Sequence, residues 1–344
     1  MSIRKLFIVL PLLITIAVSC DKNSSSPTGP DENNAYVASN VIAFNDVQHV
    51  LGENYALALI NPDSKEIIKL GPNMTTASYS WSDDATRLVM SDFNTPDPEN
   101  RLSEYQICVI YADGSKIYKY DAYGISPILS PDNKKIAFLQ SNENIGSINS
   151  RNLYIYEIQN SEITLLKENI ESIVDWSDNG ENIIYYTQLY NYSSRNDEER
   201  TYYSIDYKSK EVESITYPVL SYDPDDDGEL NNFYNAILSP DGSKWLHSNM
   251  KVAFDPITFK IQYMTSLYTV NYNGTGEKIL FEKEELVFMS YSWAPDSKRI
   301  TYTDGASLNV IDSDGSNQEV LIEFEPYSME NPLPTLFIPT WSPR

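Results

Sequence analysis

The sequence predicts an all-β protein, a six-bladed β-propeller in which every blade is a four-stranded antiparallel sheet. Three observations lead to this fold: a tight-turn motif that recurs along the chain, a strand-and-turn pattern that recurs in step with it, and two strands without hairpin partners near the two ends. The turn motif is clearest in Ser239-Pro240-Asp241-Gly242-Ser243-Lys244-Trp245-Leu246. A period of about 50 residues with several short strands is typical of a propeller, with one blade per repeat.

The turn motif predicts a β-hairpin in each repeat. Its other copies are Trp81-Ser82-Asp83-Asp84, Ser130-Pro131-Asp132-Asn133, Trp176-Ser177-Asp178-Asn179, Trp293-Ala294-Pro295-Asp296 and the truncated Trp341-Ser342-Pro343-Arg344. Proline pre-sets the first corner of a type I turn, and glycine or asparagine tolerates the left-handed position that follows. The recurring aspartates (Asp83, Asp132, Asp178, Asp241 and Asp296) are therefore interpreted as turn residues, because a repeat separates them too widely for metal binding.

The second pattern is an apolar strand that ends in a polar turn. Its six copies are Ala58-Leu59-Ile60-Asn61, Cys108-Val109-Ile110-Tyr111, Tyr154-Ile155-Tyr156-Glu157, Tyr203-Ser204-Ile205-Asp206, Tyr268-Thr269-Val270-Asn271 and Asn309-Val310-Ile311-Asp312. Six copies of each element indicate six blades. The expected spans are 41–72 with 335–344, 77–121, 123–169, 170–217, 218–282 and 283–326.

The two chain ends predict how the ring closes. Phe337-Ile338-Pro339-Thr340-Trp341 reads as an innermost strand whose hairpin partner is missing, and Val41-Ile42-Ala43-Phe44 reads as a second strand without its preceding turn. Pairing the C-terminal strand with the N-terminal blade would complete that blade. It would also remove open sheet edges, which invite aggregation.

The first forty residues are expected to be a lipoprotein signal and a tether. Residues 1–19 have a basic start and an apolar run that is short for a membrane span, as in a secretory signal peptide. Ala17-Val18-Ser19-Cys20 resembles the bacterial lipobox, which implies acylation of Cys20, for example with palmitate. Plain secretion with an ordinary cysteine is the alternative. Residues 20–40 are too polar to fold alone, and 41–344 form the propeller domain.

Composition excludes one class of partner. The formal net charge of −24 opposes nucleic-acid binding, because repulsion from phosphates would dominate. After removal of the signal, Cys108 is the one cysteine besides the acylated Cys20. It lies in a predicted strand and is interpreted as a small core residue.

The strongest metal motif lies in an insertion before the fifth repeat. Asp223, Asp225 and Asp227 alternate and are followed by Gly228 and Asn231. Alternating carboxylates closed by a glycine turn are how short loops surround Ca²⁺, although the acidic residue that ends an EF-hand loop is absent. The two interpretations are a weak calcium site and a solvated acidic loop.

No catalytic motif is recognisable, so the chain is predicted not to be an enzyme. The only histidines are His49, in a variable loop, and His247, at a blade-core position equivalent to Phe138 and Tyr302. A glycosidase pair among the 49 acidic residues stays open. Among the 26 tyrosines, Tyr190, Tyr192 and Tyr222 lie in insertions and are candidates for ligand contact, with loop packing as the alternative.

The consensus Trp-Ser-Pro-Asp-Gly-Lys-x-Ile-Ala-Phe, matched best at 129–138, 238–247 and 293–302, resembles the WD-repeat-like propeller repeat of the TolB family. The resemblance covers 41–344 and implies the propeller fold, without the α/β domain that precedes it in TolB. Together with the lipobox it implies a lipid-anchored binding or scaffold module of the bacterial cell envelope, on the periplasmic or surface side, for a protein, peptide or glycan. The alternatives are a propeller-type carbohydrate-active enzyme and a TolB-like accessory component of an envelope-integrity or export machine.

Overall fold

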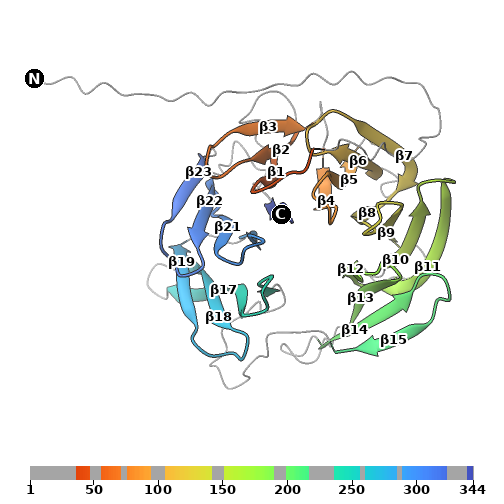
Figure 1. Ribbon diagram of the computed structural model, residues 1–344. Helices are drawn as coiled ribbons and strands as arrows, with labels where there is room; N and C mark the ends of the chain where they lie inside the picture. Colours follow the sequence, from red (N-terminus) through yellow and green to blue (C-terminus); the bar gives the residue numbers. More distant parts are fainter. Residues whose placement is uncertain are drawn as a thin grey trace, which may run out of the picture.

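The computed structural model describes residues 36–46, 56–70, 76–93, 105–141, 151–189, 199–216, 236–255, 260–284, 289–323 and 339–343. Within these residues the chain forms β-strands and no helix, so none of the described segments is a helix that could cross a membrane. The strands make six antiparallel four-stranded sheets arranged around a common centre (Figure 1). The predicted fold class, an all-β six-bladed propeller, is confirmed.

Each sheet is one blade, with its strands ordered from the innermost to the outermost as follows. Blade 1 contains β24 (Thr340–Trp341), β1 (Ile42–Asp46), β2 (Ala56–Ile60) and β3 (Ile67–Leu70). Blade 2 contains β4 (Thr76–Trp81), β5 (Arg87–Phe93), β6 (Tyr105–Tyr111) and β7 (Ile117–Tyr123). Blade 3 contains β8 (Ile125–Leu129), β9 (Lys135–Ser141), β10 (Arg151–Glu157) and β11 (Glu162–Ile170).

Blade 4 contains β12 (Ser172–Trp176), β13 (Asn182–Leu189), β14 (Glu199–Asp206) and β15 (Val212–Ile215). Blade 5 contains β16 (Ile237–Leu238), β17 (Lys244–Asp255), β18 (Lys260–Asn271) and β19 (Lys278–Glu284). Blade 6 contains β20 (Tyr291–Trp293), β21 (Arg299–Thr303), β22 (Ser307–Asp312) and β23 (Glu319–Glu323). The predicted blade spans agree closely with these bounds; the outermost strand of blade 2, for instance, ends at Tyr123 rather than at position 121.

The ring closes in blade 1, as the two chain ends predicted. Strand β24 pairs antiparallel with β1, with Trp341 opposite Ile42 and Thr340 opposite Ala43. The backbone N–H of Ser342 donates to the carbonyl of Val41 at 2.8 Å, which extends the pairing by one step. The closing strand is described from position 339 onward, so the part predicted at 337–338 lies outside the described residues.

The propeller has two unlike ends. Because the strands alternate in direction, the turn between the first two strands and the turn between the last two lie at the same end of every blade. We call this the turn end, and the opposite one the loop end. Each internal gap in the described residues is flanked by strand ends at the loop end.

The chain enters the ring at the turn end. Residues 36–41, the N-terminal arm, lie against turns of neighbouring blades: the N–H of Ala38 donates to the carbonyl of Ala85 at 2.9 Å, and the Asn40 amide donates to Asp63 at 2.6 Å. Ala38 is fully buried. The arm is therefore fixed to the end that carries the tight turns.

The turn motif folds as predicted, and the recurring aspartates lie in the turns. In four blades the turn serine donates a hydrogen bond to the residue two positions later, in the pairs Ser82–Asp84, Ser130–Asp132, Ser177–Asn179 and Ser239–Asp241, at 2.7, 2.6, 2.7 and 2.7 Å. Asp84 and Asn179 thus accept this bond, whereas Asp83 and Asp178 occupy the proline position. The next residue has positive φ in each turn, for example Asn133 at 56° and Gly242 at 70°.

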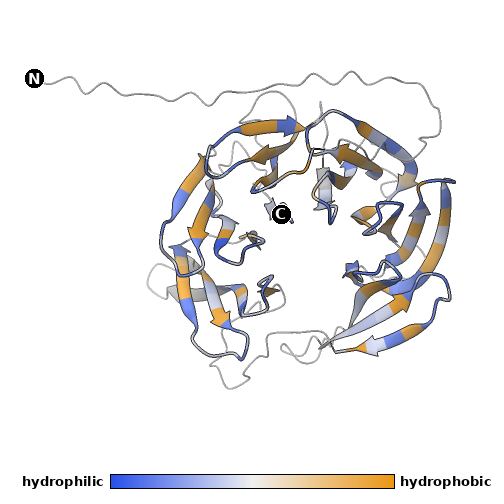
Figure 2. Ribbon diagram, in the orientation of Figure 1, coloured by the Kyte–Doolittle hydropathy of each residue, from blue (hydrophilic) through white to orange (hydrophobic). Residues whose placement is uncertain are grey.

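The recurring tryptophans connect neighbouring blades. Three indole N–H groups donate to an innermost-strand carbonyl of the preceding blade: Trp81 to Thr340 at 3.3 Å, Trp176 to Ile128 at 3.4 Å and Trp293 to Ile237 at 3.0 Å. Apolar side chains fill the space between blades, while hydrophilic residues alternate with them on outer strands such as β7 and β11 (Figure 2). Cys108 lies fully buried between blades 1 and 2, as a small core residue should.

Candidate functional site

The site residues proposed from sequence lie outside the described residues. This applies to the acylation site Cys20, to the calcium-loop positions Asp223, Asp225, Asp227 and Asn231, to the tyrosines Tyr190, Tyr192 and Tyr222, and to His49. Their flanking strands are described. Leu189 and Glu199 border one of the insertions, and Ile215 and Ile237 are the strand ends nearest the other; all four lie at the loop end.

Three carboxylates influence one another near the inner strands of blades 2 and 4. Asp175 precedes Trp176 on β12, and Asp83 and Asp178 occupy proline positions of two turns at the turn end. Burial among protein atoms and the negative charges of Asp83 and Asp178 together raise the pKa of Asp175 to about 6, against the lowering effect of a hydrogen bond from the Trp176 N–H. Loss of hydration, together with Asp84 and Asp178, also raises the pKa of Asp83. Since Asp175 is exposed on the surface, water screens part of this repulsion.

His247 is held in the neutral form inside blade 5. Its side chain is 2% exposed, its ring stacks on Tyr268 with centroids 5.1 Å apart, and burial lowers its pKa to about 4. The carboxylate of Glu277 lies 3.6 Å from Nε2, but a neutral imidazole forms no ion pair with it at neutral pH. The position is a blade-core one, as the repeat alignment predicted, and Phe138, Met90, Tyr185 and Tyr302 at the equivalent positions are equally buried.

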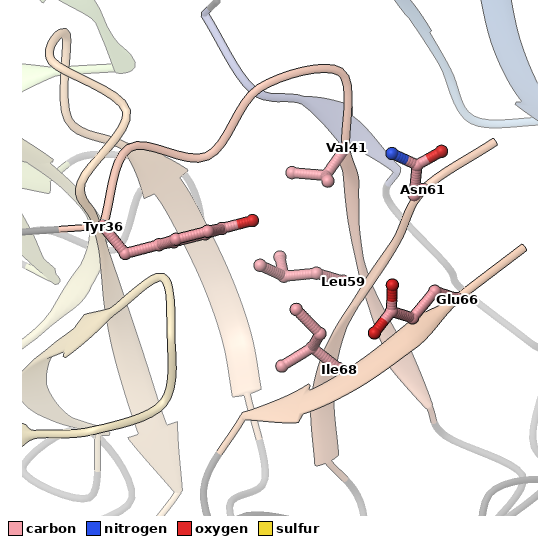
Figure 3. Close-up of a pocket in the computed structure, with 6 residues that line it drawn as sticks. All are labelled: Tyr36, Val41, Leu59, Asn61, Glu66 and Ile68. Atoms are coloured by element: carbon pink, nitrogen blue, oxygen red, sulfur yellow. The ribbon is translucent and has the colours of Figure 1, made fainter. Parts of the chain in front are cut away.

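A small pocket lies beside the N-terminal arm, at the turn end of blade 1. It has a volume of about 60 Å³ and is lined by Tyr36, Val41, Leu59, Asn61, Glu66 and Ile68. Figure 3 shows the Tyr36 ring directed toward Leu59, with Asn61 and Glu66 on the far side. Sites for metabolites usually exceed about 300 Å³, so this pocket holds only a few waters or a small side chain.

Metal binding has no support among the described residues. No group of three or more histidine, cysteine, aspartate or glutamate side chains within them is placed to hold an ion. The recurring turn acids already accept hydrogen bonds inside their own turns; Asp241, for example, accepts from Ser239 and from the N–H and hydroxyl of Ser243. The proposed calcium loop lies in the undescribed part of the chain and is untouched by this result.

The comparisons with known proteins support the fold. No family model matches the chain, and no curated protein matches its sequence. Among solved structures, TolB from Acinetobacter baumannii is 16% identical, with a TM-score of 0.54 over 89% of this chain and 67% of that one. A protein assigned as TolB from Agrobacterium tumefaciens is 15% identical, with a TM-score of 0.46 over 89% and 95% of the two chains. An oligogalacturonate lyase in complex with manganese is 11% identical, with a TM-score of 0.43 over 83% and 74%.

The first of these similarities carries weight for the fold alone, since the identity is low. It agrees with six closed four-stranded blades and with the recurring turn motif. The chain has a TolB-like six-bladed propeller.

Proposed function

We propose that this chain is a lipid-anchored, non-catalytic propeller of the bacterial cell envelope that acts as a binding or scaffold module. The observation that carries the proposal is the fixed N-terminal arm. Its contacts with Ala85 and Asp63 hold the chain's point of entry at the turn end. An acylated Cys20 would therefore attach the turn end to the membrane and leave the loop end facing away.

Tether length agrees with this arrangement. Cys20 and Tyr36 are separated by 16 steps along the chain, and a tether of the kind that composition predicts would span roughly 20–25 Å on average over that length. That is about the height of a blade with strands of six or seven residues. Long connections at the loop end would then be accessible to a partner, as functional loops on rigid scaffolds usually are.

Fractionation of cells tests the anchor. In Cys20→Ala the protein should move from the membrane fraction to the soluble fraction, and the lipid mass should disappear from its N-terminal peptide. Cys108→Ala is the matched control, because it removes the other cysteine from a buried core position and should leave attachment unchanged. Membrane attachment that persists in Cys20→Ala would refute the proposal. Capture experiments with the unacylated protein would then distinguish a general binding module from an accessory component of a larger envelope machine.

One observation favours a second function, a propeller-type carbohydrate-active enzyme. A carboxyl group with a raised pKa beside other carboxylates, as at Asp175 with Asp83 and Asp178, is the arrangement that acid–base hydrolysis of glycosides uses. Release of reducing sugar from envelope polysaccharide by wild type, and its loss in Asp175→Asn, would establish this function. Equal, background-level release by both proteins would eliminate it.

A further inference from the structure

The pocket at the turn end of blade 1 combines an apolar floor with three polar groups. Leu59 on β2 and Ile68 on β3 pair in register and form the floor. Asn61 and Glu66 form the next pair toward the turn end, where the N–H of Asn61 donates to the carbonyl of Glu66 at 3.0 Å. Because residues two apart on a strand share a face, these polar side chains stand on the same side as the floor. Tyr36 of the N-terminal arm forms the opposite wall (Figure 3).

Local hydrogen bonds fix the direction of the Asn61 amide. Its Oδ1 accepts from the backbone N–H groups of Asp63 and Ser64 at 2.9 and 3.0 Å, within the turn itself. Nδ2 therefore points away from the turn, and Figure 3 shows it on the side of Val41. An amide nitrogen can only donate, so this wall of the pocket offers a hydrogen-bond donor.

The other two polar groups are acceptors. Figure 3 shows the Glu66 carboxylate and the hydroxyl end of Tyr36 directed into the pocket from opposite sides. Glu66 makes no ion pair with the described residues, and the neighbouring cation Lys65 pairs with Glu319 at 2.7 Å. Tyr36 is 42% exposed, so its hydroxyl is accessible to a ligand. A carboxylate and a hydroxyl that face each other across a cavity suit a cation that can donate to both.

The arm distinguishes this turn from a similar one in blade 4. Ser209-Lys210-Glu211 repeats Ser64-Lys65-Glu66, and in both copies the serine hydroxyl accepts from the glutamate N–H, at 3.2 and 3.3 Å. Only the copy in blade 1 lies beside Tyr36 of the arm. Glu211 is therefore a matched reference for Glu66, in the same kind of turn without the wall that the arm supplies.

We propose that this pocket binds a phosphoethanolamine group. The ammonium donates to the carboxylate of Glu66 and to the hydroxyl of Tyr36, and the short methylene chain lies on Leu59 and Ile68. A volume of about 60 Å³ admits the ethylammonium end and leaves the phosphate at the mouth, where it accepts from Asn61 Nδ2. The formal net charge of −24 favours a ligand that enters with its cationic end.

The inference deepens the proposed function, on which its membrane part rests. Phosphoethanolamine is a lipid headgroup as well as a soluble compound, and the turn end is the end that an acylated Cys20 would attach to the membrane. Tyr36 and Val37, which are 42% and 44% exposed, add apolar surface beside the pocket, and tyrosine suits a membrane–water interface. Headgroup binding would hold the propeller against the membrane surface instead of leaving it free on its tether.

The first measurement is binding of soluble O-phosphoethanolamine to the full chain in nonionic detergent, by saturation-transfer NMR. A Kd of about 1 mM is expected for so small a contact. Glu66→Gln should weaken binding about threefold to fivefold through loss of one exposed charge pair, and Tyr36→Phe should weaken it through loss of an acceptor. Glu211→Gln is the matched control and should leave the Kd unchanged. Inorganic phosphate, which lacks the cation, should not compete.

Three outcomes would overturn the site. The first is absence of binding up to about 10 mM, well above the expected Kd. The second is an equal Kd for wild type and Glu66→Gln. The third is tighter binding of a lysine-containing peptide than of O-phosphoethanolamine, which would identify a protein side chain as the occupant.

Vesicles identify the source of the group. The Cys20→Ala chain, purified from the soluble fraction, should sediment with vesicles of mixed phosphatidylethanolamine and phosphatidylcholine, and Glu66→Gln should reduce the sedimented fraction. Vesicles of phosphatidylcholine alone should not bind it, because a trimethylated ammonium has no N–H to donate. Equal sedimentation with both kinds of vesicle would overturn headgroup recognition, whereas binding of the soluble compound alone would support the site and assign it to a soluble ligand.

The pocket and the anchor can fail separately. Attachment of wild type through Cys20 is measured by the lipid mass on its N-terminal peptide, which changes at Glu66 do not affect. A complex with a Kd of about 1 mM dissociates on the dilution that fractionation involves, so the pocket does not hold Cys20→Ala in the membrane fraction.

Discussion

Replacing His247 with phenylalanine should remove an acid-sensitive contribution to stability. The buried imidazole has a pKa of about 4, against 6.5 for an accessible histidine. Below pH 6.5 the unfolded chain therefore binds a proton at this side chain that the folded chain does not. The folded state loses stability as pH falls from 6.5 toward 4, and the full loss is about 3 kcal/mol.

Phenylalanine suits this position because Phe138 and Tyr302 occupy the equivalent places in blades 3 and 6, both fully buried. A phenyl ring can keep the stacking on Tyr268 and cannot titrate. Urea denaturation at pH 7 and at pH 4.5 measures the effect. Wild type should lose about 2 to 2.5 kcal/mol more than His247→Phe between these two pH values.

Comparing the two proteins cancels the contributions of the carboxylates, which titrate in the same range. Glu277→Gln is the control for the neighbouring carboxylate: it should change stability at pH 7 by less than about 0.5 kcal/mol, because a neutral imidazole offers no ion pair and Glu277 is exposed. An identical pH dependence in wild type and His247→Phe would refute the reasoning, since it would mean that His247 titrates alike in the folded and unfolded chains.

Four other results are expected. Deleting residues 337–344 should cost about 3–5 kcal/mol, because it removes the buried Trp341 and opens blade 1; an unchanged melting temperature would contradict ring closure. In denaturant titrations, Trp293→Phe should lower the free energy of unfolding by about 1 kcal/mol more than Trp341→Phe does. The Trp293 indole donates a hydrogen bond to Ile237, whereas the buried Trp341 Nε1 has no partner among the described residues. Equal losses of stability in the two variants would show that the Trp293 hydrogen bond does not stabilise the contact between blades. Asp175→Asn should flatten the pH dependence of stability between about pH 4 and 6. The pKa of Asp175 is raised in the folded state, so its contribution to the stability of the wild type falls as pH rises through this window. An unaltered pH profile would show that the pKa of Asp175 is not raised in the folded protein. Calcium at about 100 times its Kd should raise stability by about 2.7 kcal/mol in wild type and not in Asp225→Ala, by thermal melting with and without chelator; equal shifts would place the ion elsewhere.

The blade count and the ring closure could be predicted because their signals are local or terminal. A Ser-Pro-Asp-Gly sequence determines its own turn through backbone restriction and the serine hydroxyl, so each copy identifies a hairpin without reference to the rest of the chain. In the structure the hydroxyl of Ser239 donates to Asp241 at 2.7 Å, a hydrogen bond that lies within the turn itself. Where proline is absent, as in Ser82-Asp83-Asp84, sequence alone does not determine which aspartate accepts the serine's hydrogen bond: Asp83 lies in the turn as predicted, and Asp84 is the acceptor.

The surroundings of single strand residues could not be predicted, because they depend on which surfaces face each other. Tyr186 follows the same strand alternation as Leu139, and an aromatic residue in a strand usually packs in a core. Only the register and the exposure show that Tyr186 is half-buried while Leu139 is fully buried. Asn249 is equally unremarkable in sequence, since Gln140 and Asp304 show that a polar residue is common at its position. Asn249 Oδ1 has no hydrogen-bond partner among the described residues, and this is a property of the assembled ring.

These differences bear on where function can lie in a repeat protein. A residue that recurs from blade to blade performs a task that those blades share: the turn serines and their acceptors close hairpins, and three of the tryptophans connect neighbours. Their hydrogen-bonding groups are occupied, as in Ser130 with Asp132 and Trp176 with Ile128. A ligand can compete for such groups only by breaking the blade. We therefore expect recognition to use positions that depart from the repeat, and Asn249, whose Oδ1 has no hydrogen-bond partner among the described residues, is such a departure.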